Sequence, residues 1–123
     1  DRESGNRKLE GAMEIKIQKV NQNLVIVKID GRFNIEEVIT FEKAINDIID
    51  QGPKAVSLNM SELKYIDSSG IGSLIKAMNI AKNKDIELVI TDLDKEIMHI
   101  FKLAYLDRFF TICTQEEILN RYP

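Results

Sequence analysis

The chain has 123 residues, of which 44% are hydrophobic and 30% are charged, with a net charge of -3. This length suits one domain, and two prolines and six glycines leave little room for a disordered or fibrous protein. Because basic residues alternate with acidic ones and no apolar run approaches about 18 residues, we expect neither nucleic acid nor a membrane as a direct partner.

The composition also bears on the compartment and on metals. Residues 1–12 are polar and without period, so we interpret them as a remnant of an expression vector and assign residues 13–122 to the domain. No apolar signal segment is present, and Cys113 has no partner for an internal disulfide, which favours the cytoplasm. We expect a buried, inert thiol at Cys113. His99 and Cys113 alone make a poor ligand set, so we expect no metal and no cofactor.

The first half of the domain predicts two strands and a helix. Ile15 and Ile17 alternate with polar residues, as on a half-buried strand, and a turn at 21–23 leads to a second strand over 24–29. The pair is typical of a hairpin. Asn34 with Glu37 has the spacing of a capping box, which predicts a helix that ends at Gly52-Pro53.

The second half alternates between strand and helix patterns. In chain order we expect a strand over 55–60, a loop over 61–66, a helix from Asp67 to about 82, a strand over 86–91, a helix capped by Asp94, a strand over 110–113, and a helix capped by Thr114 and Glu117 that reaches about Tyr122.

This order, β-β-α-β-α-β-α-β-α, predicts one α/β domain. The crossover helices imply a mixed, mostly parallel β-sheet, and the opening hairpin adds an antiparallel edge. About four helices would cover the apolar strands of that sheet.

The segment Asp67-Ser68-Ser69-Gly70 stands where a helix should begin. A helix N-terminus presents unpaired N–H groups and the positive end of the helix dipole, so a phosphate on a hydroxyl there would be tolerated. The same residue types are also ordinary helix caps. Capping alone and phosphate regulation therefore both remain open from these residues.

The hypothesis that the protein is an enzyme has less support from the sequence than either of these interpretations. Ser68 and Ser69 lack the glycine two residues before the serine that defines a nucleophile elbow, and His99 is on another predicted helix. The segment Gly70-Ile71-Gly72-Ser73 lacks the Gly-Lys-Ser/Thr ending of a phosphate-binding Walker A loop. Asp30, Asp67 and Asp92 all lie near strand ends, where caps and turns explain them. We expect that the protein is not an enzyme.

In this setting the segment 67–72 resembles the signature of STAS domains, and is most similar to that of bacterial anti-sigma factor antagonists. The similarity extends over residues 13–122. It includes the segments 30–34 before the first helix and 106–110 after the third.

The resemblance implies that Ser68, with neighbours Asp67, Ser69 and Gly70, is phosphorylated by a partner that is both an anti-sigma factor and a serine kinase. A serine phosphatase would reverse the modification. The unphosphorylated form would bind the partner and so free a sigma factor for transcription in a stress response. We expect the partner-binding surface to have two parts. The first turns of the helix would contribute Ile71 and Gly72, and an adjacent loop would contribute Gly31, Arg32, Phe33 and Asn34.

Two positions depart from the family pattern. Many members have Asp where this chain has Asn34, and the segment 104–106 lacks the usual glycine at the helix exit. Two alternatives to the switched antagonist remain. One is a STAS scaffold or partner-binding domain that is never phosphorylated, and the other is a small nucleotide- or anion-binding domain.

Overall fold

The structure, a computed structural model, describes residues 12–123. The predicted vector remnant, apart from Ala12, lies outside the described residues. The elements in chain order are β1 (Met13–Lys19), β2 (Leu24–Phe33), the 3-10 turn η1 (Ile35–Glu37), α1 (Val38–Asp50), β3 (Ala55–Asn59), β4 (Leu63–Ile66), α2 (Ser68–Asn83), β5 (Glu87–Thr91), α3 (Lys95–Leu103), the 3-10 turn η2 (Leu106–Arg108), β6 (Thr111–Cys113) and α4 (Gln115–Arg121).

The strands form one mixed sheet in the order β1-β2-β3-β5-β6, and β4 also pairs with β2. β1 is antiparallel to β2, and every other pairing is parallel. The predicted fold class, hairpin and crossover helices are therefore confirmed. No helix within residues 12–123 is both long and apolar enough to cross a membrane.

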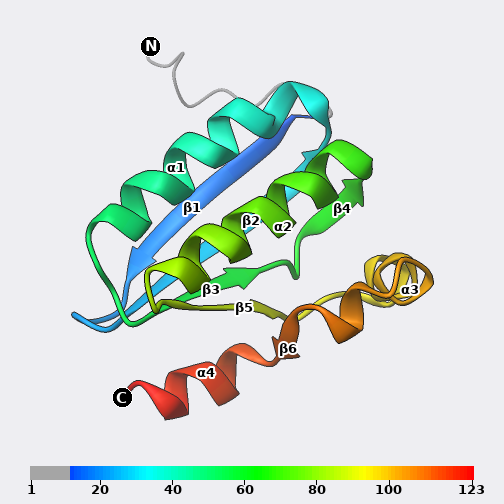
Figure 1. Ribbon diagram of the computed structural model, residues 1–123. Helices are drawn as coiled ribbons and strands as arrows, with labels where there is room; N and C mark the ends of the chain where they lie inside the picture. Colours follow the sequence, from blue (N-terminus) through cyan, green and yellow to red (C-terminus); the bar gives the residue numbers. More distant parts are fainter. Residues whose placement is uncertain (1–11) are drawn as a thin grey trace.

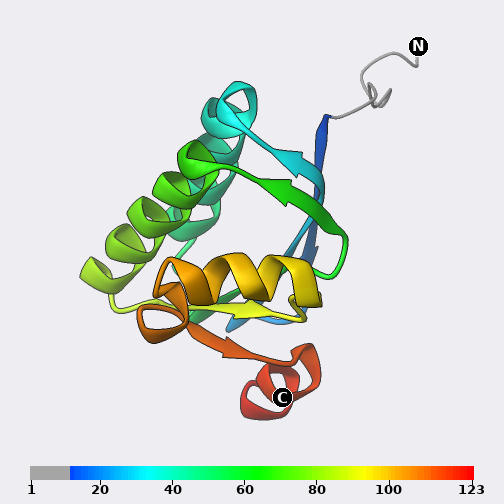
Figure 2. The ribbon, with the colours of Figure 1, turned by 90° about the vertical axis from the view of Figure 1, so that its right-hand side faces the viewer.

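Helices cover both faces of the sheet (Figures 1 and 2). α1 and α2 run side by side over one face, where alternate residues of the strands, such as Val27 and Leu58, join the main core with Phe41 and Leu74. α4 packs on the opposite face, where Ile118 contacts a smaller cluster of strand residues. Several residues with a helical period in the sequence are buried here, among them Phe41, Leu74 and Phe101, whereas Ala104, expected on the apolar side of its helix, is exposed.

The segment 61–66, expected to be a loop, instead contains strand β4. β3 pairs with the first half of β2, and β4 pairs with the last part of β2 on the same side, with Phe33 opposite Ile66. Between them the chain turns at Met60 to Glu62, and the Gly31 N–H donates to the Glu62 carbonyl at 3.0 Å. The register shifts at Gly31, whose φ of 104° suits glycine. This second pairing carries the chain to the site.

Two local expectations at the helix ends had different outcomes. The Thr114–Glu117 capping box is present. The one at Asn34 is not formed, because the Glu37 N–H donates to the Asn34 carbonyl in a 3-10 turn. The Asn34 side chain instead accepts from the Glu36 N–H at 3.0 Å, so Asn34 caps η1, and α1 begins three residues later than its cap predicts.

Candidate functional site

The start of α2 lies where β2 and β4 end side by side (Figures 1 and 2). The Asp67 N–H donates to the Phe33 carbonyl at 3.3 Å, just beyond the last paired residues of the two strands. The parallel β2–β4 pairing therefore places the motif 67–70 next to the segment 31–34. The sequence predicted this neighbourhood, although through a loop instead of a strand.

Asp67 is the N-cap of α2. Its backbone is extended, and its carboxylate accepts hydrogen bonds from the N–H groups of Ser69 at 3.0 Å and Gly70 at 3.1 Å. The capping interpretation of this residue is confirmed. The Asp67 carboxylate thus binds two of the N–H groups that have no partner within the helix. It occupies part of the anion-binding site that an uncapped helix N-terminus would offer.

Ser68 is the first residue of α2 and is exposed, whereas Ser69 is half-buried. The Ser68 hydroxyl has no hydrogen bond within residues 12–123, so it takes no part in capping the helix. A solvent-exposed hydroxyl at a helix start is chemically able to accept a phosphoryl group. Additional charge at this position would face solvent or a partner without any need to open the fold.

Gly70 fixes how closely α2 approaches the sheet. It is buried, and a Cβ atom built on it would lie 2.7 Å from the Phe33 carbonyl oxygen and 2.8 Å from the Ile66 Cγ1. Any side chain at this position would push the helix start away from both strands. Gly70 therefore sets the position of the helix start that carries Ser68.

The other residues expected in the partner surface divide into two groups. Gly31 to Phe33 form the end of β2, so the expected loop is wrong, and the Phe33 side chain is 0% exposed and packs on Phe41 at 4.8 Å between ring centroids. Asn34 is half-buried. Arg32 is exposed, and its guanidinium lies 4.0 Å from the centroid of the Tyr65 ring.

The two expected residues of α2 also differ. Ile71 is half-buried and packs against the main core. Gly72 is exposed, and a Cβ atom added to it would have no neighbour within 4 Å, so the helix surface beside Ser68 is open. The accessible part of the predicted surface thus consists of Ser68, Gly72, Arg32 and, in part, Asn34.

Three apolar or aromatic residues near this surface were not predicted. Tyr65 on β4 is 37% exposed, Ile35 at the start of η1 is 69% exposed, and Ile39 in the first turn of α1 is 80% exposed. Ile35 and Ile39 interrupt the helical period of buried residues, which is a signal available in the sequence. Tyr65 carries no such signal, because the sequence pattern over 61–66 predicts a loop.

The remaining candidate groups lie elsewhere. His99 is exposed on α3, and Cys113 on β6 is half-buried instead of fully buried. Burial raises the pKa of the Cys113 thiol, with Arg121 opposing the shift. Asp92 accepts from the Gln115 N–H at 3.2 Å and the Asn59 side chain at 3.3 Å, so it is a structural cap, as expected. Within residues 12–123 no three His, Cys, Asp or Glu residues meet in a metal-binding group.

Comparisons with known proteins bear on the fold and on the family. A curated relative, the anti-sigma-B factor antagonist of Staphylococcus aureus (strain NCTC 8325 / PS 47), is 23% identical over 95 residues, which make up 76% of this chain and 88% of that protein. Among solved structures, an anti-sigma factor antagonist from Mycobacterium paratuberculosis matches 94% of this chain and 97% of its own, with a TM-score of 0.80 and 15% identity.

A further solved structure is the phosphorylated form of the Bacillus cell fate determinant SpoIIAA. It matches 89% of this chain and 100% of its own, with a TM-score of 0.70 and 20% identity. At these identities the solved structures establish a shared fold. The family model of the STAS domain matches residues 15–118, which is most of the chain and includes the whole site. The resemblance inferred from the motif is thereby confirmed, and the chain belongs to the STAS domain family.

Proposed function

We propose that the protein is an anti-sigma factor antagonist whose partner binding is switched by phosphorylation of Ser68. The observation that carries this proposal is the exposed Ser68 hydroxyl, directly after the Asp67 cap and at the first turn of α2. The names of the Staphylococcus relative and of the phosphorylated Bacillus structure support the same role.

The proposed partner is an anti-sigma factor that is also a serine kinase, and a serine phosphatase would restore the hydroxyl. The unphosphorylated chain would bind the kinase and release a sigma factor. In this role the chain is a binding module in the cytoplasm and needs no catalytic base, metal or cofactor of its own.

The charge of the phosphate supplies the switch. A phosphoserine carries about -1.5 to -2 charges at pH 7. Because Asp67 already holds the N–H groups of Ser69 and Gly70, the added phosphate cannot be neutralised by them and projects outward. In a complex that had enclosed a neutral hydroxyl, this charge would be desolvated beside the Asp67 carboxylate.

The size of this effect is sufficient for regulation. A penalty of about 4 kcal/mol would weaken binding roughly a thousandfold, at about 1.4 kcal/mol for each factor of ten. The uncharged Asn34, where many family members have Asp, leaves one fewer acid near the phosphate.

The test is phosphate transfer and binding with purified serine kinases of the anti-sigma type. Incubation with ATP followed by mass spectrometry should find phosphate on Ser68. Ser68→Ala should abolish the transfer and keep kinase binding, and Ser68→Asp should weaken binding by about a hundredfold or more, because one carboxylate carries part of the phosphate charge.

Ser69→Ala is the matched control, because it removes the neighbouring hydroxyl from the same helix turn. It should accept phosphate at Ser68 and bind as the unaltered chain does. Phosphate found only on other residues, or equal binding by Ser68→Asp and Ser68→Ala, would contradict the proposal.

A further inference from the structure

β1 is one end of the sheet, and no other strand in the described part of the chain pairs with its outer edge. β1 pairs only with β2, and within residues 12–123 no backbone hydrogen bond outside that pairing involves residues 13–19. The second half of the strand, Lys16 to Lys19, is exposed throughout. An open strand edge is a row of unpaired N–H and C=O groups that another strand can extend.

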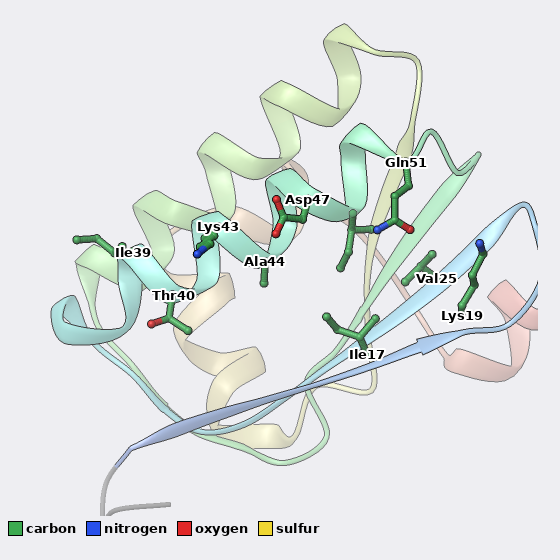
Figure 3. A pocket seen from close by; sticks show the side chains of 10 residues that line it. Ile17, Lys19, Val25, Ile39, Thr40, Lys43, Ala44, Asp47 and Gln51 are labelled. Carbon is green, nitrogen blue, oxygen red and sulfur yellow. The ribbon is translucent and has the colours of Figure 1, made fainter. Parts of the chain in front are cut away.

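A groove lies directly above this edge, between β1 and α1 (Figure 3). It has a volume of about 530 Å³. Val25 and Ile48 form a buried apolar floor, and Ile17, which is 54% exposed, points from β1 toward Ala44 on α1. The groove exists because α1 packs over β2 and leaves the outer strand only partly covered, so that Ile17 is less buried than its alternating pattern predicts.

The charges beside the open edge are mainly positive. Lys19 and Lys43 line the groove, and no ion pair within residues 12–123 includes either of them. On the opposite face of the strand pair, Lys16 stands directly across from Lys28, an arrangement of like charges that is unfavourable by itself.

Acidic groups are also present, and they are placed differently. Asp47 lies on α1 one turn from Lys43 and offsets it. Glu14 faces Asp30 at the other end of β1, and its contact with Lys16, at 3.9 Å between two exposed side chains, contributes little. Over the exposed half of β1, the excess charge is therefore positive.

We propose that the edge of β1 binds an extended acidic peptide, which adds to the sheet as a further strand. Side chains of such a strand alternate between the two faces. Apolar side chains on one face would close the groove over Ile17, and carboxylates on the other face would lie beside Lys16 and Lys28. The groove lining runs from Ile39 to Gln51, a length of roughly 18 Å at about 1.5 Å per helical residue, which fits five or six extended residues at about 3.3 Å each.

The same observations disfavour a second copy of this chain as the occupant. The β1 edge of another molecule would bring its own Lys16 and Lys19 to this surface, and charged edge residues are a common protection against such self-pairing. The same lysines would repel a second β1 edge and attract the carboxylates of an acidic strand. The proposal does not depend on Ser68, which lies at the start of α2.

A designed probe tests the proposal. The probe is a capped peptide of about six residues that alternates glutamate with valine, and its counterpart alternates lysine with valine. In NMR titrations the acidic peptide should slow amide hydrogen exchange within Lys16–Lys19 and shift the resonances of Ile17 and Ala44. The basic peptide should do neither.

Two double variants of equal net charge separate the site from general electrostatics. Lys16→Glu with Lys28→Glu, which reverses the two charges expected beside the peptide carboxylates, should weaken binding by at least about tenfold. Lys95→Glu with Lys102→Glu changes two exposed lysines on α3, which does not line the groove, and should alter binding by less than about twofold at moderate salt. Circular dichroism would establish that both variants fold.

Several results would overturn the inference. The first is that the basic peptide binds as tightly as the acidic one. The second is that the acidic peptide slows amide exchange at the opposite sheet edge, Thr111–Cys113, as much as in β1. The third is that amide exchange in β1 is not slowed at saturating acidic peptide. Because neither a kinase nor phosphate takes part, failure here would leave the switch at Ser68 untouched, and failure of that switch would leave this surface untouched.

Discussion

Gly70 and Gly72 stand two residues apart in α2, and their surroundings are opposite. A Cβ at Gly70 would meet backbone, the Phe33 carbonyl oxygen at 2.7 Å, which cannot move aside as the tip of a flexible side chain can. We predict that Gly70→Ala lowers the free energy of unfolding by about 2–3 kcal/mol through overpacking. Urea denaturation followed by circular dichroism measures this loss.

Gly72→Ala is the control in the same helix. A Cβ at Gly72 has nothing within 4 Å, and alanine is the better helix former, so this change should raise the free energy of unfolding by about 0.5–1 kcal/mol. Equal effects of the two substitutions would mean that helix propensity, and not contact with β2, decides the role of Gly70.

The sequence predicted the polar half of the site and not its apolar support. Asp67 and Ser68 could be placed at a helix start because cap residues act through bonds within a few positions. The burial of Phe33 and the close approach of Gly70 depend on strands far apart in the chain. Such contacts have no local signal, and the expected loop at 31–34 therefore concealed them.

At the scale of whole elements, the main error of the sequence-based prediction is strand β4, expected to be part of a loop. Its residues, Leu63 to Ile66, are buried, exposed, exposed and buried in turn, so they lack the period of two that identifies a half-buried strand. The strand is held by pairing with β2 and by the packing of its two ends. The longer helices and the buried strands β3 and β5 were predictable, because each carries its period over several residues.

The exit of α3 contains a residue in an unfavourable conformation. Tyr105 follows the helix with a φ of 60°, in the left-handed region, at the corner where family members usually have glycine. The conformation costs a non-glycine residue about 1–2 kcal/mol. The ring is 66% exposed, and its contact with Arg108, at 5.3 Å from the guanidinium carbon to the ring centroid, returns little of that cost.

We therefore predict that Tyr105→Gly raises the free energy of unfolding by up to about 1 kcal/mol, after the greater chain entropy of unfolded glycine is subtracted. Thermal denaturation should detect a higher midpoint. Lys102→Gly, in the last turn of the same helix, should instead lower stability by about 1 kcal/mol. A loss of stability in Tyr105→Gly would show that the exposed ring has a packing role.

At the scale of the whole molecule, the C-terminal helix joins distant parts of the chain. The Asn21 side chain, in the turn between β1 and β2, donates to the Tyr122 carbonyl at 2.9 Å across 101 positions of sequence. The Tyr122 hydroxyl donates to the Glu87 carboxylate at 2.7 Å, and Arg121 pairs with the same carboxylate at 3.0 Å. These contacts, with buried Ile118, hold α4 on the face of the sheet that α1 and α2 leave open.

The hydrogen bond from Tyr122 to Glu87 makes the packing of α4 on the sheet dependent on pH. It raises the pKa of Tyr122 above its ordinary value of 10.0, with burial as the second cause, because only the neutral phenol can donate to the carboxylate. A raised pKa means that the folded state holds the proton more tightly than the unfolded state does. The stabilisation is therefore complete below pH 10 and is lost as the pH rises through the folded-state pKa.

Tyr122→Phe should consequently lower the free energy of unfolding by about 1 kcal/mol at pH 8, the ordinary size of such a partly exposed hydrogen bond. The difference between the variant and the unaltered chain should shrink toward zero above the folded-state pKa, where the unaltered chain has lost the same bond. Urea titrations between pH 8 and pH 11.5 measure that difference directly, since all other groups titrate in both proteins. Tyr65→Phe is the control, because its hydroxyl has no hydrogen bond within residues 12–123 and its ring keeps the contact with Arg32. A constant difference across this range would assign the effect of Tyr122 to packing instead of to the bond with Glu87.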